Sequence, residues 1–97
     1  MSESGRQRAF HAFISGRVQG VGFRYSALQK ARSLHLDGWV RNTPDGRVET
    51  YAQGSQEALE GFLRWLRKGP DFSRVDDLSY SMVSPKTSSR KGFTIVY

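Results

Sequence analysis

Residues 16–24 read Gly-Arg-Val-Gln-Gly-Val-Gly-Phe-Arg, and the segments on both sides of this stretch indicate how the chain is organised. Before it, residues 8–15 form a short strand-like run that Gly16 ends. After it, apolar residues recur at helical spacing from Phe23 to Leu34, which predicts a helix. A glycine loop leading from a strand into a helix suits an anion, because the first helical N–H groups lack partners within the helix and lie at its positive end. The same pattern also fits a tight structural connection, so the glycines alone do not decide between the two.

Further patterns predict the remaining elements. Residues 36–42 and 47–53 are expected to form a hairpin, because the Thr-Pro-Asp-Gly sequence at 43–46 is a strong turn signal. A second helix should begin after Ser55 and end at Gly69, and alternating residues predict strands around 78–82 and 93–97. This order predicts an α+β protein of the ferredoxin-like split βαβ type (βαββαβ). Its sheet is mostly antiparallel, with two helices on one face.

The composition limits the class of protein. The 97 residues suffice for one domain, which we expect at residues 9–97 behind a flexible tail at residues 1–8. The absence of cysteine excludes disulfides, thiolate metal sites and a cysteine nucleophile. The sequence contains no apolar run near the length of about 20 residues that a membrane span needs, and the first eight residues lack a signal-peptide pattern. We therefore expect a cytoplasmic protein with no membrane partner.

The charge is basic and unevenly placed. The net charge is +6, and residues 1–42 hold seven basic and two acidic residues, a surplus of five. The rest of the chain holds eight basic and seven acidic residues, a surplus of one. Such an excess suits an anionic partner that meets the first half of the chain, although a solvated basic surface would look the same.

Two side chains are candidates for chemistry. Arg24 falls in the first turn of the predicted helix, where a surface arginine opposes the helix dipole but a guanidinium can hold two phosphate oxygens. Asn42 ends a predicted strand just before the turn. Its carboxamide could orient a water molecule, because it both donates and accepts, or it could bond only to the local backbone.

Together these segments resemble the acylphosphatase family. Residues 16–24 and residues 38–49, which read Gly-Trp-Val-Arg-Asn-Thr-Pro-Asp-Gly-Arg-Val-Glu, look like the two signatures of that family, and residues 93–97 look like its last strand. The resemblance covers residues 10–97. It implies hydrolysis of acyl phosphates to a carboxylate and inorganic phosphate by a monomer, with no cofactor, metal or nucleic-acid partner. By position, Arg24 would bind the phosphoryl group and Asn42 would orient the attacking water. The backbone N–H groups expected to share the phosphate are those of Val18, Gln19, Gly20, Val21 and Gly22.

The chemistry of acyl phosphates is consistent with so small a set of residues. Hydrolysis of a phosphate ester usually uses a metal, an acid or a strong base, whereas a carboxylate leaving group with a pKa of about 4 departs without protonation. The carboxylates here are scattered, and His11 and His35 are far apart in the sequence, so we do not expect either histidine to be a catalyst.

Two other functions remain open at the level of sequence. Residues 91–97 begin with the Lys-Gly-Phe of an RNA-recognition signature, but Thr94 and Ile95 depart from it, and packing in the core is expected for Phe93, Ile95 and Tyr97. The second alternative is a module that binds a small anion without turning it over. Trp39 and Trp65 are expected to be packed or half-buried rather than ligand platforms.

Overall fold

The computed structural model describes residues 7–86 and 91–97. The elements follow in the predicted order: β1 (Arg8–Arg17), α1 (Phe23–Ser33), β2 (Asp37–Asn42), β3 (Val48–Gly54), α2 (Gln56–Lys68), β4 (Arg74–Val83) and β5 (Phe93–Ile95). Part of the predicted tail, residues 1–6, lies outside the described residues, as do residues 87–90 of the loop expected before the last strand.

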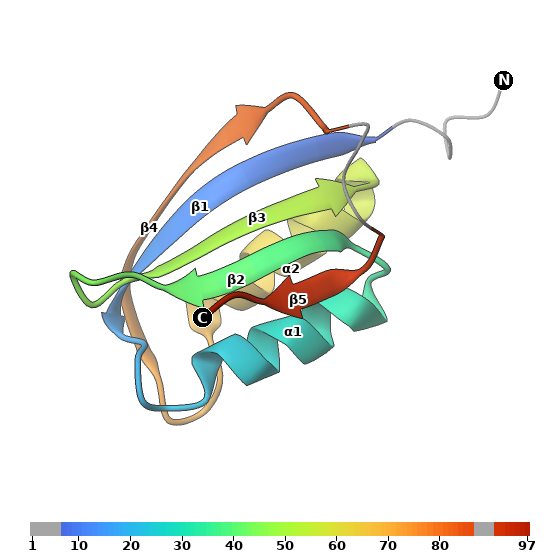
Figure 1. Cartoon of the computed structure of the whole chain (residues 1–97). Helices are drawn as coiled ribbons and strands as arrows, with labels where there is room; N and C mark the ends of the chain where they lie inside the picture. The colour runs from blue at the N-terminus through green and yellow to red at the C-terminus, as the bar shows by residue number, and fades with distance from the viewer. Residues whose placement is uncertain (1–6, 87–90) are drawn as a thin grey trace, which may run out of the picture.

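The five strands form one sheet in the order β4-β1-β3-β2-β5, and both helices pack on the same face of it (Figure 1). All neighbouring pairs are antiparallel except β2 and β5, which run parallel. This is the ferredoxin-like α+β sandwich that the sequence predicts. Within the part of the chain that the structure describes, no helix covers the other face of the sheet (Figure 1).

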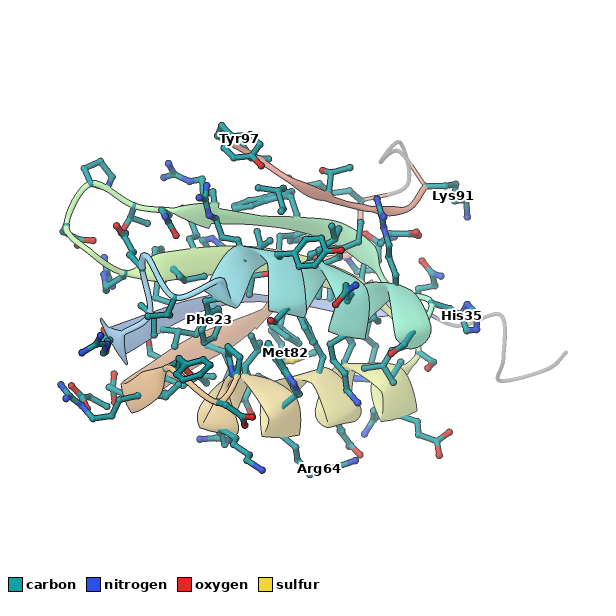
Figure 2. The ribbon with its side chains drawn as sticks, turned by 90° about the horizontal axis from the view of Figure 1, so that it is seen from below. Phe23, His35, Arg64, Met82, Lys91 and Tyr97 are labelled. Atoms are coloured by element: carbon teal, nitrogen blue, oxygen red, sulfur yellow. The ribbon has the colours of Figure 1, made fainter. Side chains whose placement is uncertain are left out.

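The core lies between the sheet and the helices because each element buries one face. Alternate residues of β1 and the i, i+3, i+7 positions of α2 point into it. The ring of Phe62 stacks on Phe10 with centroids 6.2 Å apart and meets Phe93 edge-on at 5.8 Å. Figure 2 views the molecule from below and shows Phe23 at the start of α1, where its ring lies 5.6 Å from that of Trp65. Trp39 and Trp65 are both half-buried, as expected.

The first strand is longer than predicted. Gly16 and Arg17, expected in the glycine loop, belong to β1 and pair with Val75 and Arg74 of β4. The register shifts between Ser15 and Gly16, and this bulge allows pairing to continue past the glycine. Strand β5 ends at Ile95 rather than at Tyr97. Among the described residues, neither helix is long and apolar enough to span a bilayer.

Candidate functional site

A cavity of about 190 Å³ lies where the glycine loop, the first turn of α1, the end of β2 and the last residues of the chain meet. It brings Arg24 and Asn42 together, although 18 positions separate them in the sequence. The residues that line it are Val18, Gly20, Gly22, Phe23, Arg24, Tyr25, Asn42, Ile95 and Tyr97. Gln19 and Val21, whose backbone N–H groups are also expected to bind phosphate, do not line it.

The N-terminus of α1 offers backbone donors to this cavity. Gly22 is its N-cap, in a left-handed conformation with φ 78°, and the first bond of the helix runs from the N–H of Ser26 to the carbonyl of Gly22 at 3.1 Å. The N–H groups of Phe23, Arg24 and Tyr25 precede that bond, so the helix provides no acceptor for them. Throughout α1, which is fully described, no side chain caps this end and no acidic residue lies in the first turn. An anion is the natural partner for such an end.

The Arg24 guanidinium lies over the ring of Tyr97, 5.0 Å from its centroid. The C-terminus accordingly lies beside the start of α1 (Figure 1). Tyr97 was expected in the core, but the residue is 95% exposed and rims the cavity. The reason is that β5 ends at Ile95, so the alternation of buried and exposed positions no longer applies two residues later. Tyr25, 59% exposed, forms another part of the rim.

Asn42 is the last residue of β2, and it pairs with Val48 of β3. The residue is half-buried, but its side-chain Oδ1 is fully buried and has no hydrogen-bond partner among the described residues. A buried carboxamide oxygen without a protein partner, on a residue that lines a cavity, is suited to accept a hydrogen bond from water or substrate. The alternative expectation, that Asn42 bonds only to local backbone, finds no support at this oxygen.

The turn after Asn42 is tightly bonded within itself. The N–H of Thr43 donates to the carbonyl of Arg47 at 2.8 Å, and the N–H of Gly46 donates to the carbonyl of Thr43 at 3.1 Å. The Thr43 hydroxyl bonds to the Asp45 carboxylate and, at 3.1 Å, to the carbonyl of Arg47. The hydrogen bond from Thr43, together with bonds and charge from Arg47, outweighs desolvation and lowers the pKa of Asp45.

The side chain of Gln19 reaches this turn from the glycine loop. Its Nε2 donates to the carbonyl oxygens of Thr43 at 2.9 Å and of Arg47 at 2.8 Å. Sequence reasoning placed only the backbone of Gln19 at the site. No local pattern shows this contact, because its partners lie 24 and 28 positions away.

A separate polar cluster lies on the open face of the sheet. Glu49 of β3 accepts hydrogen bonds from His11 Nε2 at 2.6 Å and from Arg41 Nε at 2.7 Å. Burial alone would raise the pKa of Glu49, but its bonds to His11 and Arg41 together hold that pKa below its ordinary value. Neither His11 nor His35 lines the cavity with Arg24 and Asn42.

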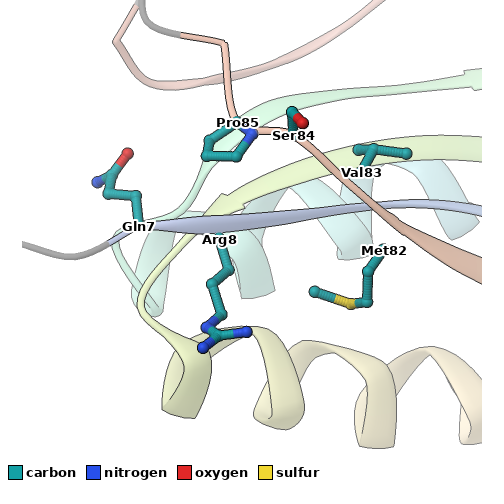
Figure 3. Close-up of a pocket in the computed structure, with 6 residues that line it drawn as sticks. All are labelled: Gln7, Arg8, Met82, Val83, Ser84 and Pro85. Carbon is teal, nitrogen blue, oxygen red and sulfur yellow. The ribbon is translucent and has the colours of Figure 1, made fainter.

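A larger cavity, of about 700 Å³, lies between the start of β1 and the end of β4 (Figure 3). Its lining residues are Gln7, Arg8, Met82, Val83, Ser84 and Pro85. It is at the opposite end of β1 from the glycine loop, and Arg8 is the one charged residue among them. Within residues 7–86 and 91–97, no three His, Asp or Glu side chains are grouped to hold a metal ion.

In the segment that echoes an RNA-recognition motif, the side chains of Phe93 and Ile95 face the core. Phe93 is buried in the core against Phe62, and Ile95 packs partly against the same core. Base stacking would require these side chains on the open face of the sheet. The geometry therefore favours the cavity at Arg24 over this segment.

The fold and the cavity define an α+β sandwich with a small cavity at the uncapped start of its first helix. A family model described as Acylphosphatase matches residues 10–95. An acylphosphatase of Trichormus variabilis is 45% identical over 85 residues, which are 88% of this chain and 82% of that relative. The crystal structure of acylphosphatase from Bacillus subtilis superposes with a TM-score of 0.87 at 40% identity, covering 93% of this chain and 99% of that one. An acylphosphatase structure from Coxiella burnetii gives 0.83 at 34% identity, covering 93% of each chain.

The chain belongs to the acylphosphatase family. This membership and these relatives support acylphosphatase activity, which is a hydrolase activity, with a small-molecule substrate and phosphate as ligands.

Proposed function

We propose that the protein hydrolyses the carboxyl–phosphate bond of acyl phosphates by metal-independent, in-line attack of a water molecule that Asn42 orients. The observation that supports this most directly is the shared cavity, which Arg24 and Asn42 line together beside the uncapped start of α1. That geometry supports a role for these residues in binding the phosphoryl group and in orienting the water.

The phosphoryl group is bound by Arg24 and by backbone N–H groups of residues 18–22 and the first turn of α1. Guanidinium and amide donors together can stabilise a dianion without a metal, and these hydrogen bonds strengthen as charge grows on the equatorial oxygens in the transition state. The guanidinium also makes a cation–π contact with the exposed ring of Tyr97.

Asn42 accepts a hydrogen bond from the attacking water through its buried Oδ1. A water molecule held in line with the phosphorus and the leaving oxygen reacts as a bound neighbour of the substrate. The reaction is faster because the water does not first have to meet the phosphorus in the right orientation. The water oxygen bonds to phosphorus, the bond from phosphorus to the acyl oxygen breaks, and the acyl group leaves as a carboxylate.

The proton of the water passes to a phosphate oxygen of the substrate. Support comes from the described residues that line the cavity, none of which has a carboxylate side chain or an imidazole to act as a base. The weakly basic carboxylate needs no proton in order to leave. Inorganic phosphate is the second product, and it should compete with the substrate.

Two variants test the assigned roles with acetyl phosphate as substrate and a chelator in the buffer. Arg24→Ala should lose phosphate affinity and turnover together, with kcat/KM lower by about 100-fold or more. Asn42→Ala should keep the inhibition constant of inorganic phosphate while kcat falls by about 100-fold.

Arg64→Ala is the matched control, because this arginine lies on the exposed side of α2, away from the cavity (Figure 2). Parent activity in Asn42→Ala would disprove the water-orienting role. Activity that the chelator abolishes would disprove the metal-independent reaction.

We also propose that the enzyme is a cytoplasmic monomer without a nucleic-acid partner. The absence of cysteine suits a reducing compartment, and all the proposed site residues come from one chain. Light scattering at assay concentration measures the molar mass and so tests whether the protein is a monomer. Fluorescence-detected binding to single-stranded RNA at low salt tests whether it binds nucleic acid.

A further inference from the structure

We infer that Gln19 is a positioning residue of the reaction, and that it acts by holding the turn after Asn42 against the phosphate-binding loop. The inference rests on the proposed roles of Arg24 and Asn42. It assigns a function to the side chain of Gln19, for which the proposed mechanism uses at most the backbone.

Both hydrogens of the Gln19 side-chain amide are used in hydrogen bonds. Its Nε2 has two hydrogens, and the carbonyls of Thr43 and Arg47 accept from it at 2.9 Å and 2.8 Å. These two carbonyls belong to the first residue of the turn and to the residue that closes it, so both ends of the turn are held from one atom.

The other hydrogen bonds of the turn do not connect it to the phosphate-binding loop. The contacts that Thr43 makes with Asp45, Gly46 and Arg47 all lie within residues 43–47. They make the turn rigid, but none of them reaches residues 18–22 of the loop. Among the hydrogen bonds of the described residues, those from Gln19 are the ones that join the loop to the turn.

The location of Gln19 gives this link a consequence for the reaction. Its neighbours Val18 and Gly20 both line the cavity, and Asn42 precedes Thr43 directly. The link therefore joins the segment that holds the phosphoryl group to the segment that holds the water. A displacement of about 1 Å between the two reacting groups can lower a rate by about 100-fold.

The residue type fits this role. A glutamine offers two neutral donors at the end of a long side chain, whereas a glutamate would place a carboxylate against two carbonyl oxygens. A lysine or arginine would donate as well but would add positive charge beside the loop.

Gln19→Met tests the inference, because methionine has a similar length and no donor. We expect kcat for acetyl phosphate to fall by about 10- to 100-fold, while KM and the inhibition constant of phosphate change by less than about threefold. Gln56→Met is the matched control. This glutamine is exposed on α2 and donates to Glu60 there, and its loss should leave kcat at the parent value.

A purely structural role for Gln19 predicts a different result. Thermal stability would fall, but kcat of the folded enzyme at low temperature would match the parent, and that outcome would overturn the inference. Equal losses in phosphate affinity and kcat would also overturn it, because they would place Gln19 in phosphate binding. If Gln19→Met does not fold, Gln19→Asn keeps the donors on a shorter side chain that cannot reach both carbonyls. It should then show the same selective loss of kcat.

A double-mutant cycle separates this inference from the proposed function. On an Asn42→Ala background the water is no longer held, so adding Gln19→Met should lower kcat by less than about twofold. Additive losses would mean that Gln19 acts independently of Asn42 and would refute the inference. If Asn42→Ala alone retains parent activity, the proposed mechanism fails instead, whatever Gln19→Met does.

Discussion

At the scale of single residues, Gly16 is a position where β1 cannot accept a side chain. Its φ is 130°, and a Cβ built there would lie 2.1 Å from the carbonyl oxygen of Arg74, which is backbone and cannot swing aside. We expect Gly16→Ala to lower the free energy of unfolding by about 3 kcal/mol or more, measured by urea denaturation. Gly20→Ala is the comparison, because Gly20 has φ 75° but open space around it, and strain alone should cost it about 1 kcal/mol. Equal stabilities for the two variants would contradict this prediction, because they would mean that the backbone of β4 moves at little cost to admit a side chain at Gly16.

Some of the candidate site residues can be predicted from local sequence patterns, and others cannot. Arg24 and Asn42 were candidates because each lies next to a local feature, a helix start or a turn, and the family resemblance assigned them to one site. The structure places them in one cavity. Their catalytic roles stay predictions. The side-chain contacts of Gln19 and the exposure of Tyr97 could not be predicted, because both depend on segments that meet only after folding. A polar side chain within a glycine loop was the one available hint for Gln19.

At the scale of elements, strands β1, β2 and β3 are tied together on the open face by Glu49. Because this carboxylate accepts bonds from His11 and Arg41, its pKa in the folded protein lies below its ordinary value of 4.5. A lowered folded-state pKa adds stability above the unfolded pKa, and that stability is lost as the pH falls through the folded value.

We therefore expect Glu49→Gln to be less stable than the parent by about 1–3 kcal/mol at pH 5–6. The difference should shrink as the pH drops below 4.5, the ordinary value, because the parent carboxylate then becomes neutral as well. Urea denaturation of both proteins between pH 6 and pH 3 measures this difference. A gap that stays constant down to pH 3 would contradict the role of the charged form.

The elements themselves were largely predictable, and the errors have physical reasons. Helix α2 begins after Ser55, whose side chain accepts from the N–H of Ala58 at 3.1 Å, and it ends before Gly69 as expected. Strand β4 begins at Arg74, earlier than its alternating residues suggest, because most of this edge strand is exposed on both faces and needs no alternation. The extension of β1 through Gly16 depends on pairing with β4, which no local pattern shows.

At the scale of the whole molecule, the cavity exists only when distant parts of the chain meet. The parallel pairing of β2 with β5 places the last residues beside α1, 73 positions after Arg24. An unfolded chain has no such arrangement, so an anion that binds this cavity binds the folded state alone. Binding must then raise the stability of the entire fold by an amount set by its concentration and affinity.

Inorganic phosphate should consequently raise the melting temperature of the protein. At ten times its dissociation constant it would add about 1.4 kcal/mol, which corresponds to a rise of roughly 5–10 °C for a chain of this size. Differential scanning fluorimetry measures the shift, with sodium chloride at equal ionic strength as the control for screening. Arg24→Ala should abolish the rise and Arg64→Ala should keep it. If the melting temperature of Arg24→Ala still rises with phosphate, the anion binds elsewhere on this basic protein. That result would disprove the proposal that the cavity binds the phosphoryl group.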